Sequence, residues 1–411
     1  MTDFSISEEL RLIGDNLLRF IDQEVVPLEE KHSSLLLNER NLYDPGGRFV
    51  QEVLALRTRV RMKSAAAGYY TMLGPEALGG VGLGSTESVH LFELIAKVYG
   101  PERPLIHPVV IPSPFTNGLS PILINMSDKA KEAFLPGIRS GEKTLCFGLS
   151  EPGAGSDVFN IRTRATRSGD NWTLNGSKQW ITNGPYADYA MIFAVTDPQA
   201  FAARSGGITG FLVETRTPGF EVDSVIPVLG HLGGDTAILS LDDVKVPDWC
   251  RLGEVDKGLA VALGGISNGR LCMAASCVGF AQWALERAIN YAKERQTFGK
   301  PIAEHQAVQM LLADCAIDIY AARNMVANCA WRVDSGQRSR KEISMVKAFA
   351  TEMLNRVMDR AIQVHGAMGL TSEMRLEAGY RFARTMRIPD GTGEIQRQTI
   401  ARELLAGHVE S

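Results

Sequence analysis

The chain has 411 residues, which is too long for one ordinary hydrophobic core, so we expect two or three domains. Hydrophobic residues make up 45% of the chain and charged residues 22%, as is typical of a globular enzyme. The formal net charge of -4 and the shortness of basic stretches such as Arg338 to Lys341 argue against a nucleic-acid partner.

The cysteines, the histidines and the first residues indicate the cellular compartment and whether a metal site is expected. The six Cys show no C-x-x-C spacing and the seven His are scattered, which favours buried thiols in a reduced cytoplasm and no metal site. The first ten residues are acidic and polar, unlike a signal peptide. No apolar run is expected to be long enough to span a bilayer, so we expect no integral membrane segment.

Residues 1–143 show a helical pattern. Leu10, Ile13 and Leu17 recur at helical spacing, and Pro27 is expected to end that helix. The same helical spacing recurs over residues 91–98, and Gly100 and Pro101 follow this segment. We therefore predict an N-terminal α-helical domain.

Residues 144–255 read as β-structure. Short apolar runs rich in strand formers lie at 190–195, 209–213, 238–241 and 244–246, and Asp242-Asp243 is expected to be a turn between the last two. Glycine and proline separate the runs, which predicts a small antiparallel β-barrel or sandwich domain.

Residues 256–411 turn helical again, with helices expected at 271–294, 305–331, 341–363 and 394–405. The order of helices, strands and helices lacks βαβ alternation, which disfavours a Rossmann sheet. The predicted fold class is α+β multidomain, with a C-terminal four-helix-bundle domain.

Two segments of the β-region could carry chemistry. Leu149 to Asp157 is rich in glycine and serine, so it could hold a planar heterocycle or an anion, or it could be an ordinary turn. Asn175 to Gly184 has Asn-Gly at both ends, which predicts tight turns. Trp180 and Thr182 between them would share one side of a strand, although a tryptophan alone is more often a core residue.

A third segment, Arg387 to Arg397, precedes the last predicted helix. Asp390 or Thr392 could be its N-cap, which is the structural alternative to a catalytic role.

Two further segments complete a pattern in chain order. Residues 291–302 match Y-A-x-x-R-x-x-F-G-x-P-I, and residues 363–369 look like Q-x-x-G-G-x-G. Together the five segments closely resemble the acyl-CoA dehydrogenase family, from about Glu8 to Leu405. The resemblance implies an α-domain, a β-domain and a second α-domain in a homotetramer or homodimer. It also implies FAD between the β-domain and the last domain, with its adenine end reaching a neighbouring subunit.

The resemblance assigns roles residue by residue. It places Leu149 and Ser150 at the flavin ring, Trp180 over one face of the ring and Thr182 by N5. It places Arg295 at the FAD pyrophosphate with Phe298 nearby. The residues expected at the adenosine half are Gln363, Ala367, Thr392 and Glu394, and those expected at the substrate are Ser156, Arg270 and Gly391.

The resemblance also implies the reaction. A base removes the α-proton of an acyl-CoA thioester while the β-hydride passes to flavin N5, giving the trans-2-enoyl product. Hydrogen bonds to the thioester carbonyl acidify that proton, each worth roughly 3 kcal/mol. Electrons would then pass to an electron-transferring flavoprotein.

The base is where this sequence departs from the family. The usual Y-E-G-T reads Pro389-Asp390-Gly391-Thr392, and the alternative position before Arg270 is Gly269. Asp390 is thus the only carboxylate at either place and is predicted to be the base. In this it is similar to vertebrate members fused to kinase-like domains. Pro389 in place of an aromatic predicts an altered pocket for a bulky, branched or cyclic acyl group.

Two alternatives stay open. One is a flavin-dependent oxidase or monooxygenase on the same scaffold, similar to nitroalkane oxidase, which also uses Asp. The other is a flavoprotein with only a structural role, because a fold does not fix a function.

Overall fold

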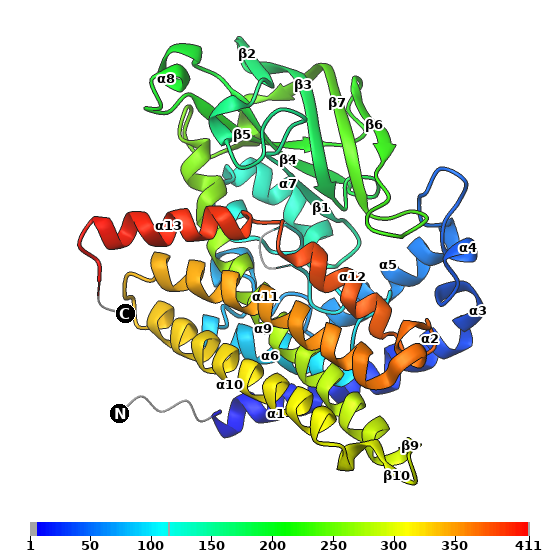
Figure 1. Cartoon of the computed structure of the whole chain (residues 1–411). Helices are drawn as coiled ribbons and strands as arrows, with labels where there is room; N and C mark the ends of the chain where they lie inside the picture. The colour runs from blue at the N-terminus through cyan, green and yellow to red at the C-terminus, as the bar shows by residue number, and fades with distance from the viewer. Residues whose placement is uncertain (1–5, 114–115, 410–411) are drawn as a thin grey trace. The chain divides into compact units, whose positions relative to one another are not determined.

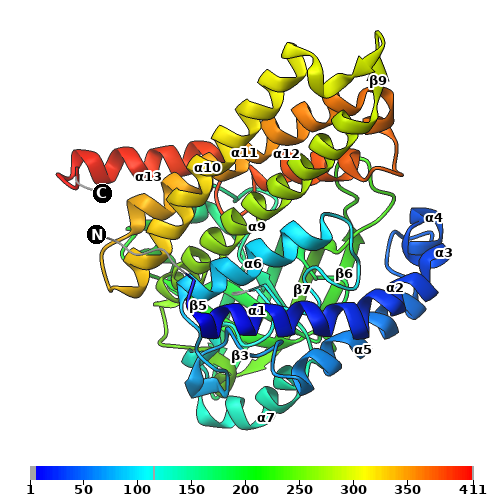
Figure 2. The ribbon, with the colours of Figure 1, turned by 90° about the horizontal axis from the view of Figure 1, so that it is seen from below.

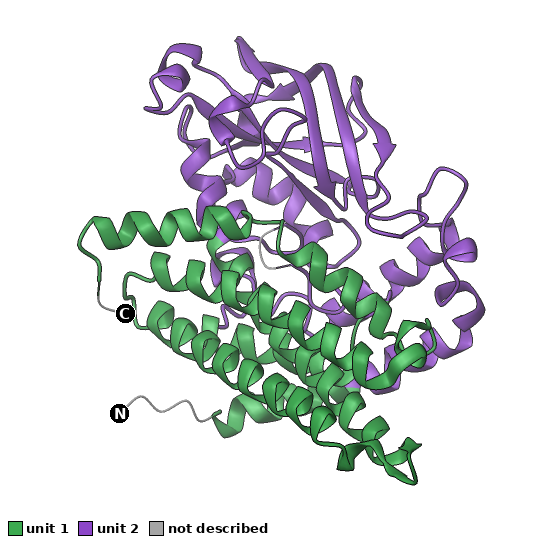
Figure 3. Ribbon diagram, viewed as in Figure 1, with its two compact units in different colours: residues 1–19, 84–103, 267–411 green, residues 20–83, 104–266 purple. Residues whose placement is uncertain are grey.

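The computed structural model describes residues 6–113 and 116–409, so residues 1–5 of the N-terminal segment Met1 to Leu10 considered above lie outside the described residues. The chain divides into two compact units (Figure 3). The first comprises residues 1–19, 84–103 and 267–411, and the second comprises residues 20–83 and 104–266. This division follows chain contacts, whereas the three predicted domains follow the change from helix to strand and back.

The first unit is built from long helices (Figure 1). Its helices are α1 (Glu8–Phe20), α6 (Ser85–Tyr99), α9 (Gly258–Glu294, which begins in the second unit), α10 (Gln306–Asp334), α11 (Arg340–His365), α12 (Leu376–Met386) and α13 (Gly393–Leu405). The short pieces are a hairpin of β9 (Gln296–Thr297) and β10 (Lys300–Pro301), and the 3₁₀ turns η6 (Ile302–Glu304) and η7 (Gly366–Leu370).

Periodic apolar residues explain the packing of this unit. On α11 the buried Val346, Ala350, Met353, Val357 and Ala361 recur every three or four residues, which gives one continuous apolar face. Buried residues of α9, α10 and α11 form one hydrophobic cluster, and Figures 1 and 2 show α10 and α11 side by side. The predicted C-terminal helices are confirmed, each within a few residues except α9.

Helix α9 corrects one expectation. It begins 13 residues before the predicted start at Leu271, because glycines at 258, 264 and 265 do not interrupt it. Its 37 residues are long and apolar enough to cross a membrane by length and composition, although 56% of its most apolar window is buried in the protein. The prediction that no run reaches that length was therefore wrong, and the helix has the burial of a core helix.

The second unit combines short helices with a sheet. Its helical pieces are η1 (Ile21–Val25), α2 (Val26–Lys31), α3 (Ser33–Leu36), α4 (Glu39–Leu42), α5 (Gln51–Ala66), η2 (Glu76–Leu78), η3 (Pro121–Asn125), α7 (Asp128–Arg139), η4 (Val158–Asn160), α8 (Pro198–Ala202) and η5 (Asp248–Cys250). Pro27 does not end the first helix as predicted. It lies in the first turn of α2, where its missing N–H costs nothing, and a π-helical turn joins α1 to α2.

The sheet has eight strands. They are β1 (Leu145–Gly148), β2 (Arg164–Ser168), β3 (Asn171–Thr182), β4 (Tyr189–Val195), β5 (Ile208–Glu214), β6 (Phe220–Val225), β7 (Thr236–Pro247) and β8 (Arg251–Leu252). Their order is β6-β7-β3-β2-β4-β5-β8, with β1 beside β4. The predicted β-region is confirmed, but β1 and β2 pair with β4 in parallel, so the sheet is mixed rather than wholly antiparallel.

Two predicted turns were wrong, and one interaction explains both. Asp243 lies inside β7 with a φ of 51°, and Asn175 lies inside β3. The Asn175 side chain accepts a hydrogen bond from the Asp243 N–H at 2.8 Å and donates one to its carboxylate at 2.9 Å. The pairing shifts register there, so both strands continue through a bulge instead of ending.

Candidate functional site

In the first unit the predicted catalytic segment is a turn between α12 and α13. Arg270 of α9 donates from Nε to the Asp390 main-chain carbonyl at 2.7 Å. Gln396 of α13 donates from Nε2 to the carbonyls of Asp390 and Gly391, at 3.1 and 3.0 Å. Lys347 of α11 donates from Nζ to the Gly391 carbonyl at 2.9 Å. Side chains from three helices thus fix the backbone of this turn.

The conformation of the turn is costly and needs that support. Asp390 has a φ of 57° and Gly391 a φ of 94°. A Cβ at position 391 would lie 2.8 Å from Gln396 Nε2 and 3.2 Å from Arg270 Nη2, so glycine fits both the space and the backbone. A non-glycine residue in the left-handed region, here Asp390, often marks a functional site.

The N-cap of α13 is Thr392 and not Asp390. The Thr392 side chain accepts a hydrogen bond from the Ile395 N–H at 3.4 Å. Asp390 lies outside the helix and does not cap it. The structural alternative for Asp390 therefore does not hold, and its carboxylate is left for another role.

The electrostatics of Asp390 suit a base that works near neutral pH. Burial raises the pKa of Asp390 to about 6, against the lowering effects of Arg270 and Lys347. Burial lowers the pKa of Lys347 to about 8 and also lowers the pKa of Arg270, and in both cases Asp390 opposes the shift. The site thus holds two cations beside one carboxylate whose pKa has moved towards neutrality.

In the second unit a buried ion pair supports the glycine-rich loop. Lys178 of β3 donates from Nζ to Glu151 Oε1 at 2.8 Å and to the carbonyls of Leu149 and Phe193, at 3.3 and 2.6 Å. The Glu151 carboxylate also accepts from the N–H groups of two residues, Arg162 at 2.6 Å and Thr163 at 3.0 Å.

Ser150 lies between the two anchored residues of this loop. Its carbonyl accepts a hydrogen bond from the Gln179 N–H at 3.0 Å, so the loop is tied to β3 just before Trp180. Ser150 is half-buried, and Ser156 further along the loop is exposed.

Trp180 and Thr182 lie at the end of β3. Both are exposed, whereas Ile181 between them is buried. Trp180 has a φ of 65° and sits at a register shift between Gln179 and Ile181. An indole left 55% exposed in a strained backbone is not a core residue, which removes that alternative.

The residues predicted at the FAD pyrophosphate lie on the β9–β10 hairpin after α9. Arg295 is exposed, and Phe298 is 97% exposed with a φ of 52°. Tyr291 of α9 stacks on His365 of α11, with ring centroids 4.4 Å apart. The hairpin therefore lies at the end of α11 that carries Gln363, which is exposed, as is Ala367 in η7.

The structure does not bring all predicted adenosine residues together within one chain. Gln363 is 16 residues beyond Lys347 on α11, about 24 Å along the helix axis. Lys347 contacts the turn that leads into Thr392 and Glu394. Gln363 and Ala367 therefore lie at the opposite end of the bundle from Thr392 and Glu394.

The motifs alone did not single out four residues of these sites. Lys178, Glu151 and Gln396 lie inside the segments singled out above but were given no role there, and Lys347 lies outside all of those segments. A signal for Lys347 existed, because it interrupts an apolar run and is flanked by the buried Val346 and Ala348. A charged residue on a core face calls for a partner.

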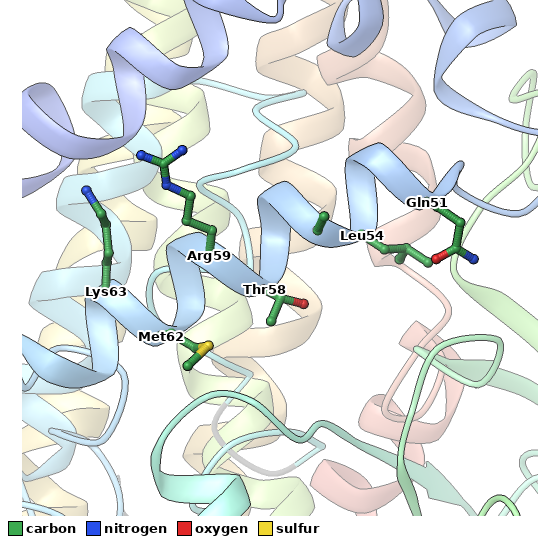
Figure 4. A pocket seen from close by; sticks show the side chains of 7 residues that line it. Gln51, Leu54, Thr58, Arg59, Met62 and Lys63 are labelled. Carbon is green, nitrogen blue, oxygen red and sulfur yellow. The ribbon is translucent and has the colours of Figure 1, made fainter.

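A surface hollow of about 660 Å³ lies elsewhere, on α5 (Figure 4). Its lining residues are Gln51, Leu54, Ala55, Thr58, Arg59, Met62 and Lys63. None of them was predicted to be a site residue.

Comparison with known proteins decides the family. Residues 146–244 match the acyl-CoA dehydrogenase middle domain, and residues 256–405 match the acyl-CoA dehydrogenase C-terminal domain. The chain belongs to the acyl-CoA dehydrogenase family. As an acyl-CoA dehydrogenase it is an oxidoreductase, and its helical and β-regions have the fold of the family.

Three relatives illustrate the range of this family. The chain is 37% identical over 362 residues to the caffeyl-CoA reductase-Etf complex subunit CarC of Acetobacterium woodii, covering 88% of this chain and 92% of that protein. It is 36% identical over 388 residues to the human mitochondrial short-chain specific acyl-CoA dehydrogenase, covering 93% and 92%. A glutaryl-CoA dehydrogenase from Mycobacterium smegmatis solved with FADH2 has a TM-score of 0.80 at 25% identity, covering 98% and 95%.

Acyl-CoA dehydrogenases depend on FAD, and the described residues suit such a group. Trp180 offers an exposed flat face beside the Thr182 hydroxyl, and Ser150 is held on an anchored loop. Arg295 offers an exposed cation of the kind that pairs with phosphate. The second unit thus offers an aromatic face and hydroxyl groups, and the first unit offers a guanidinium group, each of a kind that a flavin dinucleotide can contact.

Proposed function

We propose that this acyl-CoA dehydrogenase converts an acyl-CoA thioester to its trans-2-enoyl form, with Asp390 as the base. The observation that carries the proposal is the Asp390 turn. It combines a carboxylate whose pKa is raised to about 6, a left-handed backbone and donors from three helices on the adjoining carbonyls.

The chain's own residues account for the proton. Asp390 accepts the α-proton at its carboxylate, and Arg270 helps to keep that carboxylate ionised at neutral pH. A positioned base of this kind contributes about 10²- to 10⁴-fold to the rate. FAD, when bound, supplies the acceptor for the hydride from the β-carbon.

Backbone geometry supports a substrate role for Gly391. Because the peptide bond is planar and trans, fixing the Asp390 carbonyl towards Arg270 and Gln396 turns the Gly391 N–H the opposite way. An N–H group held in a set direction is a suitable donor to a thioester carbonyl in which negative charge develops. Ser156 is exposed and is proposed to lie along the thioester arm.

We place the flavin ring against Leu149, Ser150, Trp180 and Thr182, and the pyrophosphate against Arg295 with Phe298. Gln363 and Ala367 at one end of the bundle, and Thr392 and Glu394 at the other, are proposed to serve different FAD molecules. The distance of about 24 Å along α11 between Gln363 and Lys347, which contacts the turn before Thr392, supports this arrangement. It requires at least a homodimer, and a homotetramer meets the same need.

The names of the relatives bear on substrate and partner. CarC belongs to a caffeyl-CoA reductase-Etf complex, and a 34% identical protein of Clostridium sporogenes is a 3-(aryl)acrylate reductase. We propose an electron-transferring flavoprotein as the redox partner and an aryl or branched acyl group as the substrate. Pro389, in place of an aromatic, supports a wider pocket. Six free and buried cysteines support a cytoplasmic location.

The test is an anaerobic panel of straight, branched, cyclic and aryl acyl-CoA thioesters added to the holoenzyme. We expect bleaching of the flavin absorbance by at least one member, most strongly by a branched or aryl one. Oxygen uptake with a nitroalkane, without bleaching by any thioester, would favour the oxidase instead. Flavin that no thioester and no nitroalkane reduces would overturn the proposal.

A further inference from the structure

Lys347 has no role in the reaction as set out so far, yet its surroundings are those of a functional group. Its side chain is fully buried in the first unit, at 0% exposure. Its ammonium group donates to the Gly391 carbonyl at 2.9 Å, one residue beyond the proposed base. A lysine is almost never fully buried unless its charge is compensated.

The negative charge that acts most strongly on Lys347 is that of the Asp390 carboxylate. A neutral carbonyl alone does not offset the desolvation of an ammonium group. Burial lowers the pKa of Lys347 to about 8, and Asp390 is the strongest influence in the opposite direction. Burial raises the pKa of Asp390, and Arg270 and Lys347 both oppose that rise. Each group therefore favours the charged form of the other.

Other charged groups surround the pair. They are Arg270 and Cys277 on α9, Arg340 on α11 and Glu394 on α13. Arg270 is only half-buried and Glu394 is exposed, so water and salt screen their fields. Lys347 is fully buried, and after Arg270 it is the second charge that lowers the pKa of Asp390.

We propose that Lys347 is a positioning residue for Asp390, which acts by holding the Gly391 carbonyl and by keeping the Asp390 carboxylate ionised with its own charge. The proposal rests on the proposed function, because it takes Asp390 as the base. The interaction itself belongs to the folded chain and exists with or without a substrate.

Two variants separate the two actions. Lys347→Gln removes the charge and keeps an N–H donor for the Gly391 carbonyl, whereas Lys347→Met removes both. Lys341→Gln is the matched control, because Lys341 is also buried on α11 and also donates to main-chain carbonyls, those of His408 and Val409. Circular dichroism and flavin content report whether each holoenzyme is folded. If Lys347→Gln does not fold, the test rests on Lys347→Met alone.

The first measurement is an infrared pH titration of each holoenzyme without substrate. The carbonyl band of protonated Asp390 is identified by its loss in Asp390→Asn. We expect a midpoint near pH 6 in the wild type, raised by roughly one unit in both Lys347 variants and unchanged in Lys341→Gln. An unchanged midpoint in a folded Lys347 variant, or an equal shift in the control, would overturn the proposal.

The second measurement is the rate of flavin reduction against pH. Lys347→Gln is expected to reach a plateau within about threefold of the wild type at higher pH, and Lys347→Met a plateau roughly tenfold lower. Equal plateaus for the two variants would overturn the positioning role. Failure of every thioester with wild-type enzyme would refute the proposed function, while the infrared titration would still decide the effect of Lys347.

Discussion

Breaking the buried ion pair between Lys178 and Glu151 is expected to destabilise the protein and to weaken its hold on FAD. The side chains are 0% and 5% exposed, and Nζ and Oε1 are 2.8 Å apart. The Lys178 ammonium group also donates to the Leu149 carbonyl. The N–H of Gln179, which follows Lys178 in the chain, donates to the Ser150 carbonyl. Loss of the pair therefore releases the segment proposed to contact the flavin.

The expected magnitude follows from what each truncation leaves behind. Removing one partner of a buried pair costs about 3–5 kcal/mol, because the other charge stays buried. Lys178→Met leaves Glu151 with N–H donors from Arg162 and Thr163. The cost of this substitution should therefore lie near the lower end of that range. Burial already lowers the pKa of Lys178 to about 8, against the raising effect of Glu151. In Glu151→Gln this lysine can therefore lose its proton, which also limits the cost.

The assay is a double-mutant cycle read by urea unfolding, together with the FAD dissociation constant from flavin fluorescence. The double variant is expected to cost about 1–3 kcal/mol less than the sum of the single variants, because it leaves no lone charge. FAD affinity should fall in both single variants. Lys131→Met is the matched control: its exposed partner Asp128 is 3.6 Å away, and such pairs contribute about 0–1 kcal/mol. Additive effects, or single variants no worse than the control, would refute the reasoning.

Four shorter predictions follow from other contacts. The rate of flavin reduction at low substrate should fall as the pH drops through about 6, because protonated Asp390 cannot accept a proton; a flat profile across that range would contradict its assignment as base. Gly391→Ala should cost roughly 1–3 kcal/mol in urea unfolding, because position 391 has a φ of 94°. Trp180→Ala should weaken FAD binding roughly tenfold in a fluorescence titration while thermal stability changes little. Asn175→Ala should lower the free energy of unfolding by about 1 kcal/mol through loss of the bulge contacts with Asp243, and an unchanged value would count against that explanation.

The sequence predicted what depends on local pattern. The periodicity of apolar residues located the C-terminal helices, and the motif segments located Asp390, Trp180 and the glycine-rich loop in their elements. The start of α9 was missed because glycine is a weak helix former that tertiary packing can override. The Asn175–Asp243 bulge was misread as turns because the two residues stabilise each other across strands 68 positions apart.

The residues that support the site could not be predicted from local sequence pattern, because they meet their partners only in the folded chain. Lys347 meets the Asp390 turn only because α11 packs against that turn, 44 residues from Gly391 in the chain. Lys178 and Glu151 are 27 residues apart and meet only through the pairing of the sheet with the loop. A sequence shows the charge on such residues, but the partner becomes visible only in the fold.

The most direct test of the central claim is rapid anaerobic reduction of the flavin in Asp390→Asn, with the acyl-CoA that reduces the wild type fastest. With Asp390 as the base, the rate should fall about 10²- to 10⁴-fold while FAD content and thioester binding remain. A rate within tenfold of the wild type would show that another group removes the α-proton.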